Sequence, residues 1–134
     1  MVDQPKMPWQ DLVELCSTKG LLAKQLWVIS SKPTGGLGPI LDNLEAHLAY
    51  QTKLERDGIM FAAGPLASAD LTEWLGEGLF MYRAGSIDEA RKLAEADPMH
   101  DSGARSFTIR EWRLNEGTYS LQVYYSAGIG PKVT

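Results

Sequence analysis

His47 is one of only two histidines in this chain of 134 residues, and it lies in a segment with helical periodicity. At about 100° per residue, His47 falls on the same side of this segment as Leu44, Leu48 and Leu54, whereas the charged side chains fall on the other. Because imidazole titrates near neutral pH, an inward-facing histidine suits general acid or base catalysis. The same pattern also fits a core histidine that is hydrogen-bonded to a backbone carbonyl or to Gln51.

Asp97 is a second polar residue that the helical pattern turns inward. It falls within the apolar stripe that Ala90, Leu93 and Ala94 form along residues 86–98. A buried carboxylate is costly, and the negative end of a helix makes it more so. Two inward polar residues on two helices over one sheet face favour an acid-base pair of His47 and Asp97. The alternative is that Asp97 accepts backbone N–H groups from "PMHDSG", which follows the helix.

His100, the other histidine, is predicted to lie at the surface or at a pocket rim, where it contacts substrate. A metal site built from His47, His100 and Asp97 is possible by ligand type, but no H-x-H or H-x-x-x-H spacing supports it. The glycine-rich "GGLGP" lacks the order of phosphate-binding motifs. We therefore expect neither a metal nor a cofactor.

Four further residues are candidates for shaping a substrate pocket. Trp27 and Tyr82 lie within predicted strands, where aromatic side chains can line a pocket. Gly64 and Pro65 end another strand in the turn "AAGP". We expect all four to contact a small-molecule substrate.

Periodicity and turn residues predict the elements that position these side chains. Ser86 and Glu89 have the spacing of a helix capping box, and Pro98 marks the end of that helix. The predicted helices cover residues 8–18, 42–57 and 86–98, and 31–40 is predicted as a loop. The predicted strands cover 23–30, 59–65, 78–84, 106–114 and 118–126, and 127–134 is predicted as a loose end.

After the first helix, the order strand, helix, strand, strand, helix, strand is that of a ferredoxin-like α+β fold with an antiparallel sheet. Strand 23–30 is apolar on both faces, with Leu26 and Val28 opposite Trp27 and Ile29. Two helices can cover one face only, so the other needs a second cover. We predict a homodimer in which two sheets form an α/β barrel. Alternatively, the N-terminal helix or the C-terminal strand covers this face of a monomer.

The composition indicates one domain and excludes some partners. A hydrophobic content of 44 % suits one core, with a helical extension at 1–24, the main fold at 25–116 and a tail at 117–134. The net charge of −4 and the scattered basic residues argue against nucleic-acid binding. The single cysteine, Cys16, excludes an internal disulfide and fits core packing. Without a signal peptide or a membrane-length apolar run, we expect a cytoplasmic location and no membrane partner.

The stretch "HLAYQTKLERDGIMFAAGPL", followed by a strand and then "SIDEARKLAEADP", resembles the YCII-related domain family from about Gln25 to Leu114. The resemblance implies a dimeric ferredoxin-type α+β barrel with a His and Asp catalytic pair, which maps onto His47 and Asp97. One branch of the family dehydrochlorinates a chlorinated hydroxyquinol. Related barrel enzymes isomerise muconolactones or oxidise aromatic compounds without a cofactor.

Together, these patterns predict a small cofactor-independent enzyme of lyase or isomerase type, in which His47 transfers a proton on a small cyclic or aromatic-derived metabolite. One alternative is a non-catalytic ligand-binding or accessory protein, which a wide separation of His47 and Asp97 would favour. Another is a cofactorless monooxygenase with Trp27 or Tyr82 at its centre.

Overall fold

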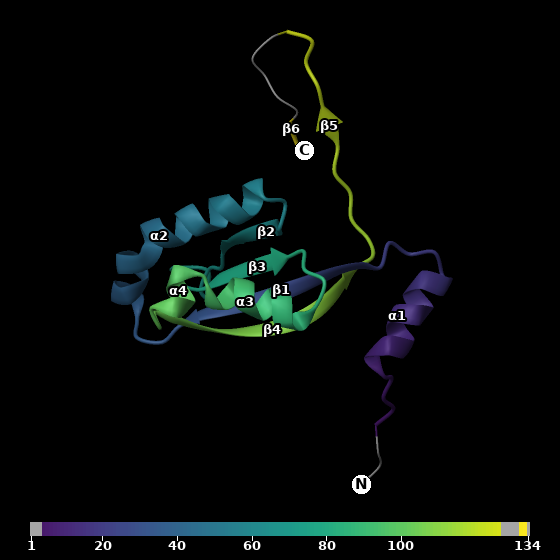
Figure 1. Ribbon diagram of the computed structural model, residues 1–134, viewed down its shortest axis with the longest axis horizontal. Helices are drawn as coiled ribbons and strands as arrows, with labels where there is room; N and C mark the ends of the chain where they lie inside the picture. The colour runs from purple at the N-terminus through teal and green to yellow at the C-terminus, as the bar shows by residue number, and fades with distance from the viewer. Residues whose placement is uncertain (1–3, 127–131, 134) are drawn as a thin grey trace. The chain divides into compact units, whose positions relative to one another are not determined.

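The computed structural model describes residues 4–126 and 132–133, which belong to two compact units (Figure 1). The larger unit is Gln25–Arg113, and the smaller unit combines the two ends of the chain, up to Lys24 and from Leu114 onward. Every candidate site residue named above falls within the larger unit.

A four-stranded sheet forms the frame of the larger unit. Its strands are β1 (Lys24–Pro33), β2 (Met60–Pro65), β3 (Gly78–Tyr82) and β4 (Arg105–Leu114), in the order β2-β3-β1-β4. The central strand β3 pairs antiparallel with both β1 and β2. Together with the helices between the strands, this order confirms the predicted ferredoxin-like α+β fold.

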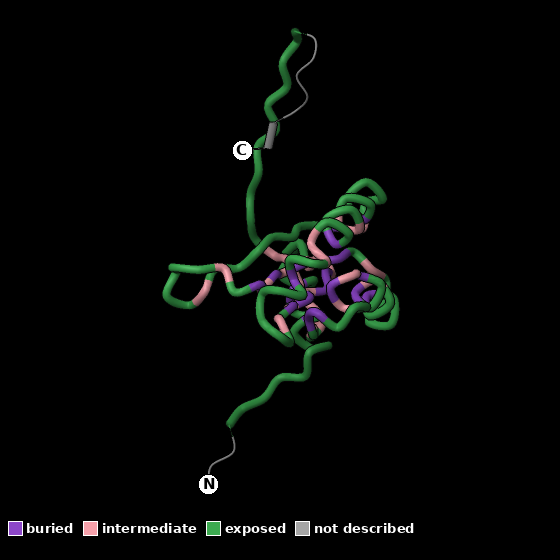
Figure 2. The backbone as a smooth tube through the Cα atoms, turned by 90° about the vertical axis from the view of Figure 1, so that its left-hand side faces the viewer, coloured by how far each residue is buried: buried purple, intermediate pink, exposed green. Residues whose placement is uncertain are grey.

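Three helices of this unit pack on the sheet face that carries Ile29, Phe80 and Tyr82. They are α2 (Leu37–Arg56), α3 (Ile87–Glu95) and α4 (Pro98–Asp101). One core cluster joins these strand residues to apolar side chains of α2 and α3, and another joins α2 to α4. The buried residues of the unit gather between the helices and the sheet (Figure 2).

The segment 31–40, predicted as a loop, is divided between β1 and α2. Strand β1 continues to Pro33, and α2 begins at Leu37 with Pro39 in its first turn. Proline is tolerated there because the first N–H groups of a helix have no intrahelical partner. Gly36, with φ 76°, supplies the turn before the helix.

The predicted capping box of α3 is half formed, because the Glu89 carboxylate accepts the N–H of Gly85, one residue before the N-cap, at 2.9 Å. Ser86 is the N-cap, and its hydroxyl accepts the N–H of Glu89 at 3.2 Å. However, α3 ends at Glu95, and the residues after it form the short helix α4 rather than a loop. Asp97 lies between these two helices.

The smaller unit contains α1 (Trp9–Thr18) and a two-stranded sheet of β5 (Leu121–Gln122) and β6 (Lys132–Val133). The buried Cys16 accepts the side-chain N–H of Asn115 at 3.3 Å. The strand predicted at 118–126 is shorter than expected, and β6 replaces part of the predicted loose end, whose residues 127–131 and 134 lie outside the described part of the chain. None of the described helices has the length and apolar character needed to cross a bilayer.

Candidate functional site

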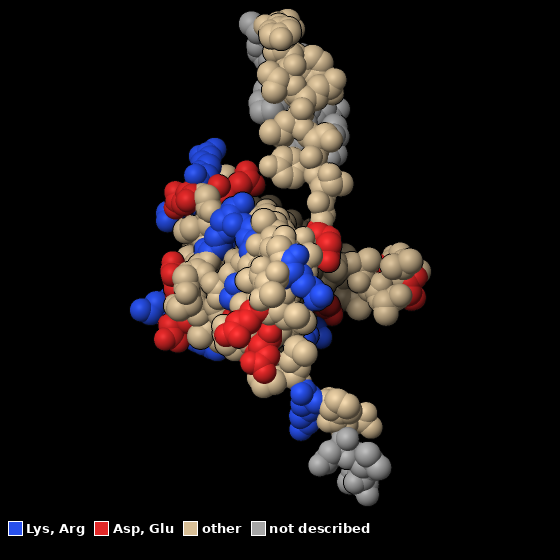
Figure 3. Space-filling model, turned by 90° about the vertical axis from the view of Figure 1, so that its right-hand side faces the viewer, with Lys and Arg blue, Asp and Glu red and all other residues tan. Residues whose placement is uncertain are grey.

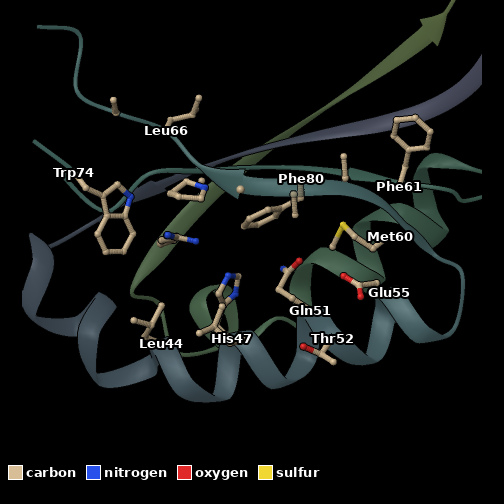
Figure 4. A pocket seen from close by; sticks show the side chains of 18 of the residues that line it. Leu44, His47, Gln51, Thr52, Glu55, Met60, Phe61, Leu66, Trp74 and Phe80 are labelled. Carbon is tan, nitrogen blue, oxygen red and sulfur yellow. The ribbon is translucent and has the colours of Figure 1, made fainter. Parts of the chain in front are cut away.

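A cavity of about 1130 Å³ opens on the helix-covered side of the larger unit, between α2 and the β2 edge of the sheet. Side chains of α2 reach toward it from one side, and β2 and β3 bound it on the other (Figure 4). The connection between β2 and β3 supplies a further wall. Its lining includes Leu44, His47, Gln51, Met60, Phe61, Leu66, Trp74, Phe80 and Arg105.

His47 points from α2 into this cavity. It shares one helix face with Leu44, Leu48 and Gln51, as spacings of three and four residues require. His47 as a whole is only 6 % exposed. The Nδ1–H group donates to Asp97, with 2.8 Å to Oδ1 and 2.9 Å to Oδ2. Because the carboxylate only accepts, Nδ1 carries the proton and Nε2 is left as the basic nitrogen.

Asp97 is fully buried, and its carboxylate accepts hydrogen bonds from three neighbouring residues. Besides His47, its carboxylate accepts the side-chain N–H of Gln51 at 2.9 Å and the backbone N–H of Met99 at 2.9 Å. Burial raises the pKa of Asp97, but the hydrogen bond and charge of His47 and the Met99 N–H outweigh it, so the pKa lies below its usual value. Asp97 is therefore an ionised partner of His47.

The placement of Asp97 corrects the prediction that the negative end of a helix destabilises its carboxylate. The residue was expected at the negative C-terminal end of its helix, but it is the N-cap of α4. Free N–H groups at a helix start stabilise a carboxylate, and the Met99 N–H is one of them. Asp97 thus contacts His47 and also accepts a backbone N–H from "PMHDSG", so the two predicted sets of contacts occur together.

Gln51 is a site residue that the sequence reasoning considered only as a partner of His47. Its amide N–H group donates to Asp97 instead, because an ionised carboxylate accepts hydrogen bonds and cannot donate them. The position was available from the sequence, since Gln51 follows His47 by four residues on the same helix face. Gln51 therefore fixes the carboxylate that orients His47.

The residues predicted to shape the pocket divide into two groups. Gly64 and Pro65 line the cavity, whereas Trp27 and Tyr82 do not. Trp27 is 6 % exposed, and its indole N–H donates to the Ala84 carbonyl at 2.9 Å. Tyr82, opposite Trp27 in the sheet, is fully buried, and burial followed by the charge of Asp97 raises its pKa. Both aromatic rings thus fill the core.

Other aromatic rings line the cavity instead. Phe61, Trp74 and Phe80 contribute to its lining from β2, the following connection and β3. The sequence could have identified Phe80, because it lies two residues before the inward-facing Tyr82 and residues two apart in a strand share a face. Trp74 lies in an irregular connection with no periodic signal. The aromatic character of the pocket was therefore predicted, but from different residues.

His100 also lies away from the cavity. Its Nδ1–H donates to the Ala94 carbonyl at 2.6 Å, and the Ser31 hydroxyl donates to its Nε2 at 2.6 Å. Its ring lies 4.5 Å from that of Phe107. Burial lowers the pKa of His100, which agrees with a neutral ring that uses both nitrogens. This half-buried histidine joins α4 to the sheet rather than forming a pocket rim.

The same contacts bear on the metal alternative. Both nitrogens of His100 are already engaged, and Nδ1 of His47 is bound to Asp97. Across residues 4–126 and 132–133, no three His, Cys, Asp or Glu side chains are grouped so as to hold a metal ion.

Side chains of both charge signs are interspersed over the face of the larger unit that Figure 3 shows.

Comparisons with known proteins agree with the resemblance read from the sequence. The sequence profile of the YCII-related domain matches residues 26–113. The uncharacterized protein YjpA of Bacillus subtilis (strain 168) is 27 % identical over 75 residues, which cover 56 % of this chain and 81 % of YjpA.

One similar solved structure is an enzyme. It is 5-chloro-2-hydroxyhydroquinone dehydrochlorinase (TftG) from Burkholderia phenoliruptrix AC1100, in complex with 2,5-dihydroxybenzoquinone. It is 26 % identical, with a TM-score of 0.55, and the match covers 65 % of this chain and 92 % of TftG. The neighbour thus combines this fold with lyase chemistry on an aromatic-derived compound.

Proposed function

The chain belongs to the YCII-related domain family, and on this premise we propose that it is a lyase or isomerase that moves a proton on a small cyclic or aromatic-derived metabolite. His47 is the proposed acid or base, and Asp97 orients it. The chemistry needs no cofactor beyond these side chains.

The observation that carries the proposal is the contact of 2.8 Å between His47 and Asp97, made by a histidine that lines a cavity. A histidine used only for packing has no need of an ionised partner and an open ring nitrogen. Asp97 holds the imidazole in the tautomer with a free Nε2 and stabilises the imidazolium that forms when Nε2 accepts a proton.

In an elimination, Nε2 of His47 removes a proton from a carbon atom of the substrate. The electron pair of that C–H bond forms a new double bond, and the leaving group departs with its own bonding pair as an anion. In an isomerisation, the imidazolium of His47 returns the proton to a different carbon atom. Both reactions use the same pair, with Asp97 ionised throughout.

The lining of the cavity supports a flat or cyclic substrate. Aromatic rings of Phe61, Trp74 and Phe80 offer apolar contact faces, and Gly64 and Pro65 add an edge without long side chains. The reaction of TftG, a dehydrochlorination, supports elimination as the first type to test.

The two other hypotheses receive less support. A wide separation of His47 and Asp97, with neither residue facing a cavity, would have favoured a ligand-binding role without catalysis, and the observed contact is direct. A monooxygenase centred on Trp27 or Tyr82 requires an aromatic residue at the reacting position, whereas both rings lie in the core.

The experiment measures turnover with 5-chloro-2-hydroxyhydroquinone and a panel of related hydroxyquinols and cyclic lactones, by chloride release and by product mass. We expect His47→Gln to reduce turnover by about 10²–10⁴-fold, the usual effect of removing a positioned acid or base. His100→Gln is the matched control, because His100 lies outside the cavity. A folded His47→Gln variant with undiminished turnover would refute the proposal, and oxygen consumption would identify the monooxygenase.

We further propose that the protein acts as a homodimer, joined through the sheet face opposite the helices. Val28, Leu79 and Met81 are half-buried on that face, and no helix of the unit Gln25–Arg113 packs against them. A second copy of this face would bury them, as the sequence pattern requires.

A further inference from the structure

Arg105 is a buried cation in the same cavity as His47, and the proposed proton transfer does not use it. It is 4 % exposed, and it lines the cavity from the first residue of β4. Its Nε–H donates to the Gly76 carbonyl at 2.8 Å, which fixes one edge of the guanidinium. Removing a cation from water is costly unless an anion or several acceptors replace the lost hydration.

The Nη1 group of the guanidinium has no acceptor that replaces its lost hydration. The Nη1 atom is buried without a hydrogen-bond partner in the described part of the chain. None of the ion pairs found in residues 4–126 includes Arg105. Asp97 acts on it through space, but the carboxylate is already occupied by His47, Gln51 and the Met99 N–H.

Arg105 and Gly78 both line the cavity, and the absence of a side chain at Gly78 keeps Nη1 from being covered. A Cβ at Gly78 would lie 3.2 Å from Nη1, closer than an ordinary contact. The Phe80 ring lies beside both side chains, with its centroid 5.5 Å from that of His47 and 6.0 Å from Cζ of Arg105. A small ring that lies against Phe80 can therefore meet both groups.

The remaining charges of the cavity do not compensate Arg105. Glu55 and Glu73 line it, but both are exposed to solvent. Exposed carboxylates are screened by water, so they add little at a buried guanidinium. The buried polar groups that reach the cavity are thus the guanidinium of Arg105, the imidazole of His47 and the amide of Gln51, beside apolar rings.

We propose that Arg105 binds an oxyanion of the ligand, so that the substrate is a small cyclic acid carrying a carboxylate or an ionised enol. This inference rests on the proposed function for the position of the reacting carbon, beside His47. The guanidinium donates from Nη1 to the oxyanion while Nε2 of His47 faces the proton to be removed. When the charged oxygen is an enol conjugated with the reacting carbon, Arg105 also holds the charge that proton removal creates.

The test uses binding of matched probes to the whole chain, measured by calorimetry. Benzoate carries the carboxylate, 2,5-dihydroxybenzoquinone carries ionised enols, and benzamide is the neutral match of benzoate in shape. We expect both anions to bind, benzoate at least about tenfold more tightly than benzamide, because a charge-assisted hydrogen bond supplies that difference. Binding by only one anion identifies whether the oxyanion is a carboxylate or an enol.

The variant Arg105→Met should abolish this preference for the anion, Arg105→Lys should retain part of it, and Arg91→Met, at an exposed arginine of α3, should leave it unchanged. If Arg105→Met does not fold, the ¹⁵N resonances of the Arg105 guanidinium in the unmodified protein provide the test, since they must shift when benzoate is added. Absence of binding by both anions, equal binding of benzoate and benzamide when 2,5-dihydroxybenzoquinone does not bind either, or an Arg105 resonance that shifts with neither anion would overturn the inference.

The outcomes for the two proposals remain distinguishable. His47→Gln should lose turnover and still bind the anions, because Arg105 is intact in that variant. Loss of the anion preference in Arg105→Met without an effect of His47→Gln on turnover would retain the binding site and reject the catalytic role of His47. The reverse result would retain the catalytic pair and reject Arg105.

Discussion

The buried carboxylate of Asp97 is tolerated because each of its neighbours is a donor. His47, Gln51 and the Met99 N–H replace the water that folding removes, and they come from α2 and from the first turn of α4. A satisfied network of this kind fixes side-chain positions. The imidazole is therefore held in one orientation before any ligand binds.

His100 is the residue for which we predict a pH-dependent stability. Burial lowers its pKa below 6.5, although Asp97 and the Ala94 carbonyl oppose this, and Arg105 and His47 add to it. The unfolded chain therefore binds a proton at His100 more readily than the folded chain does. Stability should fall as the pH drops below about 6.5, with a slope of at most about 1.4 kcal/mol per pH unit for this proton.

Thermal unfolding between about pH 5 and pH 8 measures this slope. His100→Gln should flatten it, because that variant has no group that takes up the proton. Asp97 titrates in a separate and more acidic range, because its pKa lies below 3.8 and its contribution is lost only as the pH falls through that lowered value. An unchanged slope in His100→Gln would assign the pH dependence to another group.

At the scale of the elements, the connection between β2 and β3 positions Arg105. Gly76 in this connection has φ 101°, and its carbonyl accepts the Arg105 Nε–H. A Cβ at this position would lie 2.8 Å from Cγ of Pro33, whose ring cannot move aside easily. Gly76→Ala should therefore lower the free energy of unfolding by about 1–3 kcal/mol, measured by denaturant unfolding, and weaken benzoate binding.

Gly58→Ala is the matched control, because Gly58 also has positive φ, at 76°, but meets no atom within 4 Å of an added Cβ. It should show the backbone cost alone and leave benzoate binding unchanged. Equal losses in both variants would mean that contact with Pro33 contributes nothing.

The elements that the sequence predicted well are those with a periodic or capping signal. Strand 78–84 alternated, Ser86 and Glu89 marked the start of α3, and the register of α2 turned His47 inward. The start of α2 was missed because Gly36 and Pro39 read as loop residues. A helix as short as α4 has no period to detect, so the N-cap role of Asp97 was not visible.

The site was predictable to the extent that helix register determines it. His47 and Gln51 share one face of α2, and Asp97 follows the stripe of α3. Arg105 was not predicted, because its burial depends on the Gly76 carbonyl, which lies 29 residues away in the sequence. Contacts of this range arise from tertiary packing, which local patterns do not encode.

At the scale of the whole molecule, the sheet face opposite the helices carries the last prediction. Val28 pairs with Met81 at the centre of the sheet, and both side chains are half-buried on the face opposite the helices. Apolar area on such a face gains about 25 cal/mol per Å² when a second sheet covers it. The unmodified chain should therefore sediment as a dimer at micromolar concentration.

Met81→Glu should shift this equilibrium to the monomer, because two-fold symmetry buries a carboxylate from each copy in the same interface. Ile87→Glu is the matched control, since Ile87 is 42 % exposed at the start of α3 and a carboxylate is favourable in the first turn of a helix. That variant should remain dimeric. A monomeric unmodified chain, or a Met81→Glu variant that sediments as the same dimer, would reject this sheet face as the dimer interface.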